Sequence, residues 1–163
     1  MSQPAPSPSP PPMFVVNTTA FVWHRGRYLM IVRASTKEVA PNALTPPGGK
    51  LEPPSFEGSA TAPAMLEENV RREVREEVGV EVDAITYVES LAFTGTFNGV
   101  PAPVLDVVFL TRYVSGEPVA QEEEVDGLAW LTPEQVRQDP RTMWFTLDSL
   151  ARTEAVRTGL GWE

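Results

Sequence analysis

The chain contains no cysteine and a single histidine, His24, and this composition excludes several kinds of chemistry. Without cysteine there are no disulfides, no thiol nucleophile and no cysteine-ligated zinc site. His24 lies in a predicted turn that ends at Gly26, where a structural or solvent-facing role is favoured over catalysis. A histidine-based zinc site and a Ser-His-Asp triad are therefore not supported.

Long apolar runs and positive charge are also scarce. No stretch approaches the roughly 18 apolar residues of a membrane span. The N-terminus lacks the charged segment and apolar core of a secretion signal, so we expect a soluble, cytoplasmic protein. With 22 acidic against 13 basic residues the formal net charge is -9, which argues against non-specific binding to nucleic-acid polymers. Small anionic substrates held locally by a metal ion remain compatible with this charge.

What the chain does have is a segment rich in carboxylates, Arg72–Val80 (REVREEVGV), which ends in a helix-stopping glycine. On a helix, Glu73, Glu76 and Glu77 fall within an arc of roughly 100°. Each pair of like charges three or four residues apart costs an isolated helix roughly 0.2–0.5 kcal/mol. Because Mg²⁺ binds through one or two carboxylates plus substrate phosphates, the segment predicts a metal–phosphate site.

A charged, solvent-facing helix is the alternative interpretation of the same segment, since acidic helix faces are common. Arg72 can pair with Glu68 or Glu76, and Arg71 can pair with Glu67. On this segment alone both interpretations stay open.

An apolar run upstream ends in Pro46–Glu52 (PPGGKLE). Together with Arg72–Val80 it resembles the signature of the Nudix hydrolases. That signature is a Gly, five residues, a Glu, seven residues, and then Arg-Glu-aliphatic-x-Glu-Glu-x-Gly-aliphatic. The second half matches at every specified position, and the Pro-Gly-Gly-Lys-Leu-Glu opening is also typical of the family.

The middle of the motif is longer than in that family. Residues 50–71, which are 22 in number, separate the glycine pair from Arg72 where the signature has 13, so about nine are inserted within Glu52–Pro63. Ala64 holds the position of the signature's first Glu, which in the family usually pairs with the Arg of the motif. We therefore expect Arg72 to find another partner, Glu57 or Glu68.

The resemblance implies an α/β fold, namely an α/β/α sandwich around a mixed sheet. It also implies a pyrophosphohydrolase that cleaves a nucleoside diphosphate linked to another group, with Mg²⁺ or Mn²⁺ activating water. By position, Glu76 and Glu77 would be the principal metal ligands, and Glu73 would bind metal or orient water. The Gly49 carbonyl would add a ligand. The structural residues of the motif would be Arg72, Gly48 and Gly79.

The remaining sequence predicts a single Nudix-like domain over residues 13–163, preceded by a disordered Pro/Ser-rich tail over residues 1–12. Met13 directly precedes the first predicted strand and is a second candidate for the start codon. The predicted strands are Phe14–Trp23, Arg27–Arg33, Glu81–Phe93, Pro103–Tyr113 and Leu128–Leu131. The predicted helices run from near Pro63 to Gly79, from Pro133 after an N-cap Thr132 with Gln135 closing a capping box, and over Thr146–Thr158. A turn is predicted over Thr94–Val100.

A second acidic cluster, Glu122, Glu123 and Glu124, precedes the strand that ends near Trp130. Nudix relatives often place a metal ligand or general base in such a loop, and we favour Glu122 and Glu123 for this role, with Glu123 as a metal ligand. A solvated acidic loop is the alternative.

The predicted substrate is a small nucleotide, because the resemblance to the Nudix hydrolases implies a nucleoside diphosphate derivative. Arg33 and Lys50 flank the expected cleft and are predicted to contact phosphates. Phe97 is a candidate for stacking on a nucleobase, for which ordinary packing is the alternative. Further stacking candidates are Phe56, Phe93 and Trp144.

Substrate identity stays open, since the chain matches no marker of the ADP-ribose, diadenosine-polyphosphate or coenzyme A subgroups. A homodimer also remains open. Two other functions compete with hydrolysis. One is a Nudix-fold module that senses a nucleotide without turnover, and the other is an interaction domain whose acidic helix is only a surface.

Overall fold

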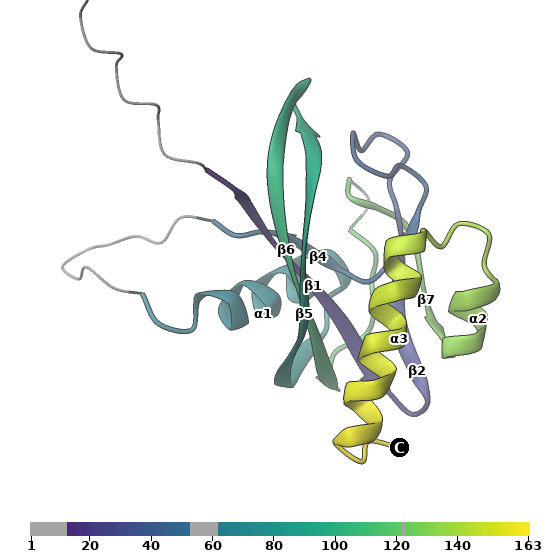
Figure 1. Cartoon of the computed structure of the whole chain (residues 1–163). Coiled ribbons are helices and arrows are strands. Elements are labelled where there is room, and N and C mark those ends of the chain that lie inside the picture. The colour runs from purple at the N-terminus through teal and green to yellow at the C-terminus, as the bar shows by residue number, and fades with distance from the viewer. Residues whose placement is uncertain (1–12, 53–61, 122) are drawn as a thin grey trace, which may run out of the picture.

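The computed structural model describes residues 13–52, 62–121 and 123–163 (Figure 1). The predicted Pro/Ser-rich tail, most of the inserted segment with Phe56 and Glu57, and Glu122 lie outside these residues.

The described residues form a seven-stranded mixed sheet with the order β3-β2-β1-β6-β5, in which β4 also pairs with β1, and β7 with β2. Only β1 and β6 run parallel among these pairs, and the other pairs are antiparallel. The strands are β1 (Val15–His24), β2 (Arg27–Arg33), β3 (Leu44–Thr45), β4 (Gly48–Lys50), β5 (Glu81–Phe97), β6 (Val100–Ser115) and β7 (Val125–Leu131). The helices are α1 (Met65–Val78), α2 (Pro133–Gln138) and α3 (Trp144–Gly159).

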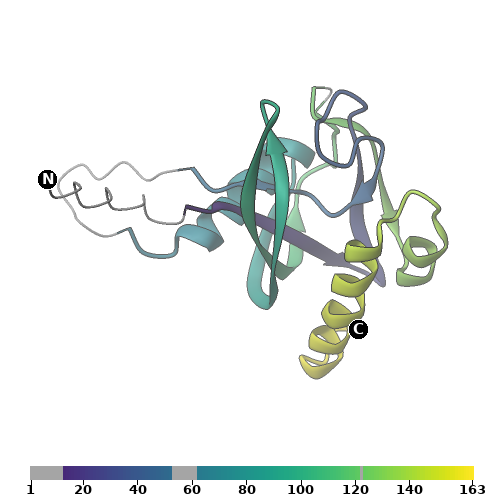
Figure 2. The ribbon, with the colours of Figure 1, turned by 45° about the horizontal axis from the view of Figure 1, so that its top comes forward.

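Helices α1 and α3 cover opposite faces of the sheet. Because successive side chains of a strand point to opposite faces, each strand can contribute to both cores. Ala20 and Val22 of β1 pack into one core with the valines of α1, whereas Phe21 of β1 packs into a second core with Leu150 of α3. Figures 1 and 2 show the strands between the two helices. This arrangement is the predicted α/β/α sandwich.

Helix α1 buries the stripe of valines that the sequence predicts. Val70, Val74 and Val78 are all buried against the sheet, and each such side chain contributes roughly 1.5–3 kcal/mol when removed from water. The helix begins at Met65, two residues after the predicted start, because Ala64 adopts a left-handed conformation with φ 54°. It ends as predicted at Gly79, whose φ of 71° suits glycine.

The connection between β5 and β6 differs from the predicted turn over Thr94–Val100. Both strands continue, with Phe97 paired to Val100, and a two-residue turn with positive φ at Asn98 and Gly99 joins them. An Asn-Gly pair is the preferred sequence for such a turn. The result is a long hairpin that projects from the sheet (Figure 1).

The other elements match their predictions closely. Strand β7 starts at Val125, three residues before its predicted start. The capping box at the start of α2 is confirmed, with Thr132 accepting from the Gln135 amide and Gln135 accepting from the Thr132 amide. Within the described residues, no helix has the length and apolar character needed to cross a membrane.

Candidate active site

Two glycines bring α1 and the sheet into close contact. Gly48 and Gly49 of β4 pair with Thr19 and Thr18 of β1. A Cβ atom on Gly48 would lie 2.1 Å from the Thr18 carbonyl oxygen, and one on Gly49 would lie 2.2 Å from Oε2 of Glu73. The backbone contact excludes a side chain at Gly48, and a side chain at Gly49 would displace the Glu73 carboxylate, so the two glycines let the α1 carboxylates approach the strand backbone.

Glu77 is the most deeply placed carboxylate of the motif. It is 5% exposed, and its Oε2 accepts a hydrogen bond of 2.8 Å from the Gly48 amide. Burial raises the pKa of Glu77 to about 7, and the negative charges of Glu73 and Glu124 act in the same direction against the Gly48 hydrogen bond and the charge of Arg33. A buried carboxylate with two acidic neighbours is a position at which a cation would be stabilising.

Arg72 binds the other two carboxylates of the motif. Its Nη2 lies 2.6 Å from Oε1 of Glu73, and its Nη1 lies 2.9 Å from Oε2 of Glu76. Burial raises the pKa of Glu73, while Arg72 opposes this effect. Pairing with Glu76 was one of the alternatives, but the expected pairing of Arg72 with Glu68 was wrong, because Glu68 pairs with Arg71.

Asn69, which was not among the residues predicted for the site, connects Arg72 to the sheet. Its Oδ1 accepts from Nη2 of Arg72 at 2.6 Å, and its Nδ2 donates to Oγ1 of Thr18 at 2.8 Å and to the Gly49 carbonyl at 3.3 Å. It thus anchors Arg72 in a chain where Ala64 replaces the family's usual Glu. An amide one turn before Arg72, on the same side of α1, was the available sequence signal.

The donor set suits a hard divalent cation, because it consists of carboxylate and carbonyl oxygens. The carboxylate of Glu73 lies where a Cβ on Gly49 would be, so it lies close to the backbone of the glycine pair. In the described part of the chain, however, no three acidic or histidine side chains are already arranged as a ligand set. Arg72 pairs with both Glu73 and Glu76, and the Glu76 side chain is 60% exposed.

The segment before β7 is fixed to the end of α1. The amides of Val119 and Gln121 donate to the carbonyls of Val78 and Glu77, at 3.1 Å each. These bonds satisfy carbonyls that a helix end leaves without partners. They also bring Glu124 near Glu77, and the charge of Glu124 raises the pKa of Glu77.

The members of that cluster differ in their surroundings. Glu124 pairs with Lys37 at 3.0 Å, and its charge raises the pKa values of Glu73 and Glu77. Glu123 is exposed and lines the cleft described below. Glu124, which the sequence analysis favoured less, is therefore a further candidate.

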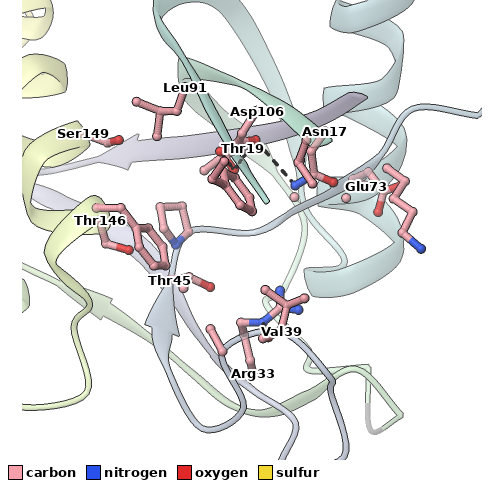
Figure 3. A pocket seen from close by; sticks show the side chains of 18 of the residues that line it. Asn17, Thr19, Arg33, Val39, Thr45, Glu73, Leu91, Asp106, Thr146 and Ser149 are labelled. Atoms are coloured by element: carbon pink, nitrogen blue, oxygen red, sulfur yellow. Dashed lines mark hydrogen bonds between the residues drawn. The ribbon is translucent and has the colours of Figure 1, made fainter. Parts of the chain in front are cut away.

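A cleft of about 1480 Å³ extends from the α1 carboxylates across the sheet to the start of α3 (Figure 3). Arg33, Lys50 and Phe97 all line it. Nζ of Lys50 lies 4.4 Å from the centre of the Phe97 ring, and Nε of Arg33 donates to the Val39 carbonyl at 3.0 Å. The fold thus brings the predicted substrate-binding residues together with the predicted metal ligands. The stacking candidates Phe93 and Trp144 also line the cleft.

The cleft contains a second polar group that the sequence analysis missed. Oγ1 of Thr19 lies 3.0 Å from both carboxylate oxygens of Asp106, and Nδ2 of Asn17 donates to Oδ1 at 3.5 Å. Figure 3 shows Asp106 and Thr19 between Glu73 on one side and α3 residues on the other. Burial raises the pKa of Asp106, and hydrogen bonds from Thr19 and Asn17 oppose this effect. A single carboxylate within an otherwise apolar strand was the available signal.

Comparison with known proteins agrees with this geometry. The family model described as the NUDIX domain matches residues 13–153. A NAD-capped RNA hydrolase, NudC, of Pseudomonas aeruginosa is 36% identical over 101 residues, which are 62% of this chain but only 29% of that relative. YfcD of Shigella flexneri, an uncharacterized Nudix hydrolase, is 33% identical over 144 residues, covering 82% of this chain and 71% of the relative.

A solved structure supports the fold independently. The MutT NUDIX hydrolase of Burkholderia pseudomallei superposes with a TM-score of 0.67 at 23% identity, covering 86% of this chain and 98% of that one. The signature residues, the sandwich fold and the match over residues 13–153 lead to one conclusion. The chain belongs to the Nudix family.

Proposed function

We propose that the protein is a metal-dependent hydrolase that cleaves the phosphoric anhydride bond of a nucleoside diphosphate linked to another group. The observation that carries this proposal is the buried carboxylate of Glu77, held by the Gly48 amide and placed near Glu73 and Glu124. Mg²⁺ or Mn²⁺ would be held by Glu73, Glu76 and Glu77 with the Gly49 carbonyl. When bound, it would supply an activated water and neutralise phosphate charge.

The residues of the chain have distinct roles in this proposal. The Gly48 amide fixes the orientation of Glu77, and Asn69 fixes Arg72 at the edge of the site. Glu123 and Glu124 lie in the cleft, where either would serve as a further ligand or accept a proton from the attacking water. Glu122 retains the same proposed role.

Arg33 and Lys50 are the proposed phosphate contacts. Both line the cleft, and neither forms an ion pair with a carboxylate among residues 13–52, 62–121 and 123–163. The other cations at this end, Lys37 and Arg72, are paired with glutamates. Unpaired cations in a cleft suit a ligand that supplies its own negative charge.

Phosphate release from a panel of nucleoside diphosphate derivatives and nucleoside triphosphates tests the proposal. The assay compares Mg²⁺ or Mn²⁺ with EDTA. We expect metal-dependent turnover of one compound class and losses of at least 100-fold in Glu76→Gln and Glu77→Gln. Glu68→Gln is the matched control, since this exposed residue on the same helix pairs only with Arg71 in the described structure. Full activity in both test variants would refute the metal assignment.

A sensor that binds a nucleotide without turnover is the second candidate. The observation that favours it is the pairing of Arg72 with two of the three motif carboxylates, in a chain that has Ala64 at the usual Glu position. It predicts binding of metal and nucleotide with no phosphate release from any member of the panel.

A further inference from the structure

We propose that the cleft has a second binding region, formed by Thr19, Glu89 and Asp106, that takes an uncharged group with two adjacent hydrogen-bond donors. This group would be the part of the substrate that carries no phosphate, so the inference deepens the proposed function. We call this region the acceptor subsite.

The strand register places the two carboxylates of the acceptor subsite on one face of the sheet. Asp106 of β6 pairs with Asn17 of β1 on one side and with Leu91 of β5 on the other. Glu89 precedes Leu91 by two residues, so its side chain points to the same face. Asp106 is 9% exposed and Glu89 is 8% exposed, and both line the cleft.

Glu89 has an acceptor atom that the described protein does not satisfy. Its Oε2 forms an ion pair with Nε of Arg152 at 2.8 Å, but its buried Oε1 has no hydrogen-bond partner among the described residues. Oγ1 of Thr45 is also buried in the lining of the cleft, and it too has no hydrogen-bond partner among the described residues. Because buried polar atoms in native proteins nearly always have partners, these atoms favour a ligand that supplies donors.

The charges of the cleft indicate which part of a substrate would lie there. Arg33 lies close enough to Glu77 for its charge to lower the pKa of that carboxyl, whereas the acceptor subsite combines two carboxylates with the guanidinium of Arg152. A phosphate would be repelled from that end, while a neutral donor group would not. Gly49 of β4 and Asp106 of β6 lie on either side of β1, so their backbones are separated by about 10 Å, or two strand spacings.

Two chemical groups present adjacent donors of this kind. One is the edge of guanine, with a ring N–H beside an exocyclic amino group, and the other is the 2′,3′-diol of a ribose. A carboxylate accepts two hydrogen bonds side by side, so it suits both groups. Exposed Phe93 and Trp144 at the cleft could also stack on a planar base.

Binding of four nucleosides to the full chain in EDTA tests the inference, with dissociation constants measured by NMR titration. Guanosine has both donor pairs, 2′-deoxyguanosine has only that of the base, adenosine has only the diol, and 2′-deoxyadenosine has neither. We expect probes with the relevant pair to bind about tenfold more tightly than 2′-deoxyadenosine. Tight binding of 2′-deoxyguanosine identifies the base as the source of the donors, and tight binding of adenosine identifies the diol.

Asp106→Asn and Glu89→Gln should each reduce this preference to less than twofold, because an amide replaces an acceptor oxygen with a donor. Asp83→Asn is the matched control, as an exposed acid on the same strand as Glu89 and outside the cleft lining. Melting curves establish which variants fold, and either folded variant is sufficient for the test. Equal binding of all four nucleosides, or an unchanged preference in a folded variant, would overturn the inference.

The experiment needs neither metal nor turnover. Preference among nucleosides without phosphate release would therefore reject the hydrolase while supporting the acceptor subsite. Turnover without any preference among the nucleosides would support the hydrolase and reject the acceptor subsite.

Discussion

The substitution Glu77→Gln should stabilise the metal-free protein at alkaline pH, although it removes a proposed metal ligand. Burial raises the pKa of Glu77 to about 7 from an ordinary value of 4.5. The folded protein therefore holds the Glu77 proton more tightly than the unfolded chain does. Glutamine keeps the shape of the protonated acid, and its side-chain oxygen can still accept the Gly48 amide.

The sign and magnitude follow from these two pKa values. The favourable contribution of the protonated carboxyl is fully present below pH 4.5 and is lost as the pH rises through about 7. A difference of about 2.5 between the pKa values, at 1.36 kcal/mol per unit, corresponds to about 3 kcal/mol of unfolding free energy. For a chain of this size that is a shift in melting temperature of about 6–12 °C.

Thermal unfolding followed by circular dichroism in EDTA measures this effect. At pH 8 we expect Glu77→Gln to melt above the wild type, and at pH 4.5 we expect the two to melt alike. Glu68→Gln removes the same formal charge from an exposed site, so it controls for net charge and should shift the melting temperature little. A wild type as stable as Glu77→Gln at pH 8 would refute the reasoning about Glu77.

Three further predictions concern the surroundings of Glu77. Gly49→Ala should weaken Mn²⁺ binding while costing the fold little, because its Cβ would lie 2.2 Å from the end of the flexible Glu73 side chain, which must move; Mn²⁺ titration and chemical denaturation test this, and an unchanged Mn²⁺ dissociation constant would contradict it. Asn69→Ala should cost about 1–3 kcal/mol in the same denaturation assay, since it removes the bonds to Thr18 and Arg72. As the pH rises toward 7, the Mg²⁺ dissociation constant should fall about tenfold per pH unit, because metal displaces the Glu77 proton, and above pH 7 it should level off. Calorimetry that shows no pH dependence would rule this out.

The helix and its sheet could be predicted from local sequence because their patterns are local. The valine stripe and Gly79 set the buried face and the end of α1, and Thr132 with Gln135 set the start of α2. The predicted turn over Thr94–Val100 was too long, because Gly95 stays paired within β5 and only Asn98 and Gly99 have positive φ.

The polar contacts of the site depend on pairings between distant segments, which the sequence does not reveal. Asn69 meets Thr18 only because α1 packs on β1, and Asp106 meets Thr19 only because β6 pairs with β1. The motif predicted which carboxylates would gather at one end of the cleft. It carried no information about the acceptors at the other end.

Mn²⁺ binding followed by electron paramagnetic resonance tests the central claim most directly, namely that the α1 carboxylates hold a divalent cation. The titration compares the wild type, Glu77→Gln and Glu68→Gln at pH 8. We expect one Mn²⁺ site in the wild type and in Glu68→Gln, and binding weakened at least tenfold in Glu77→Gln. Equal binding by all three proteins, or no binding by any, would contradict it.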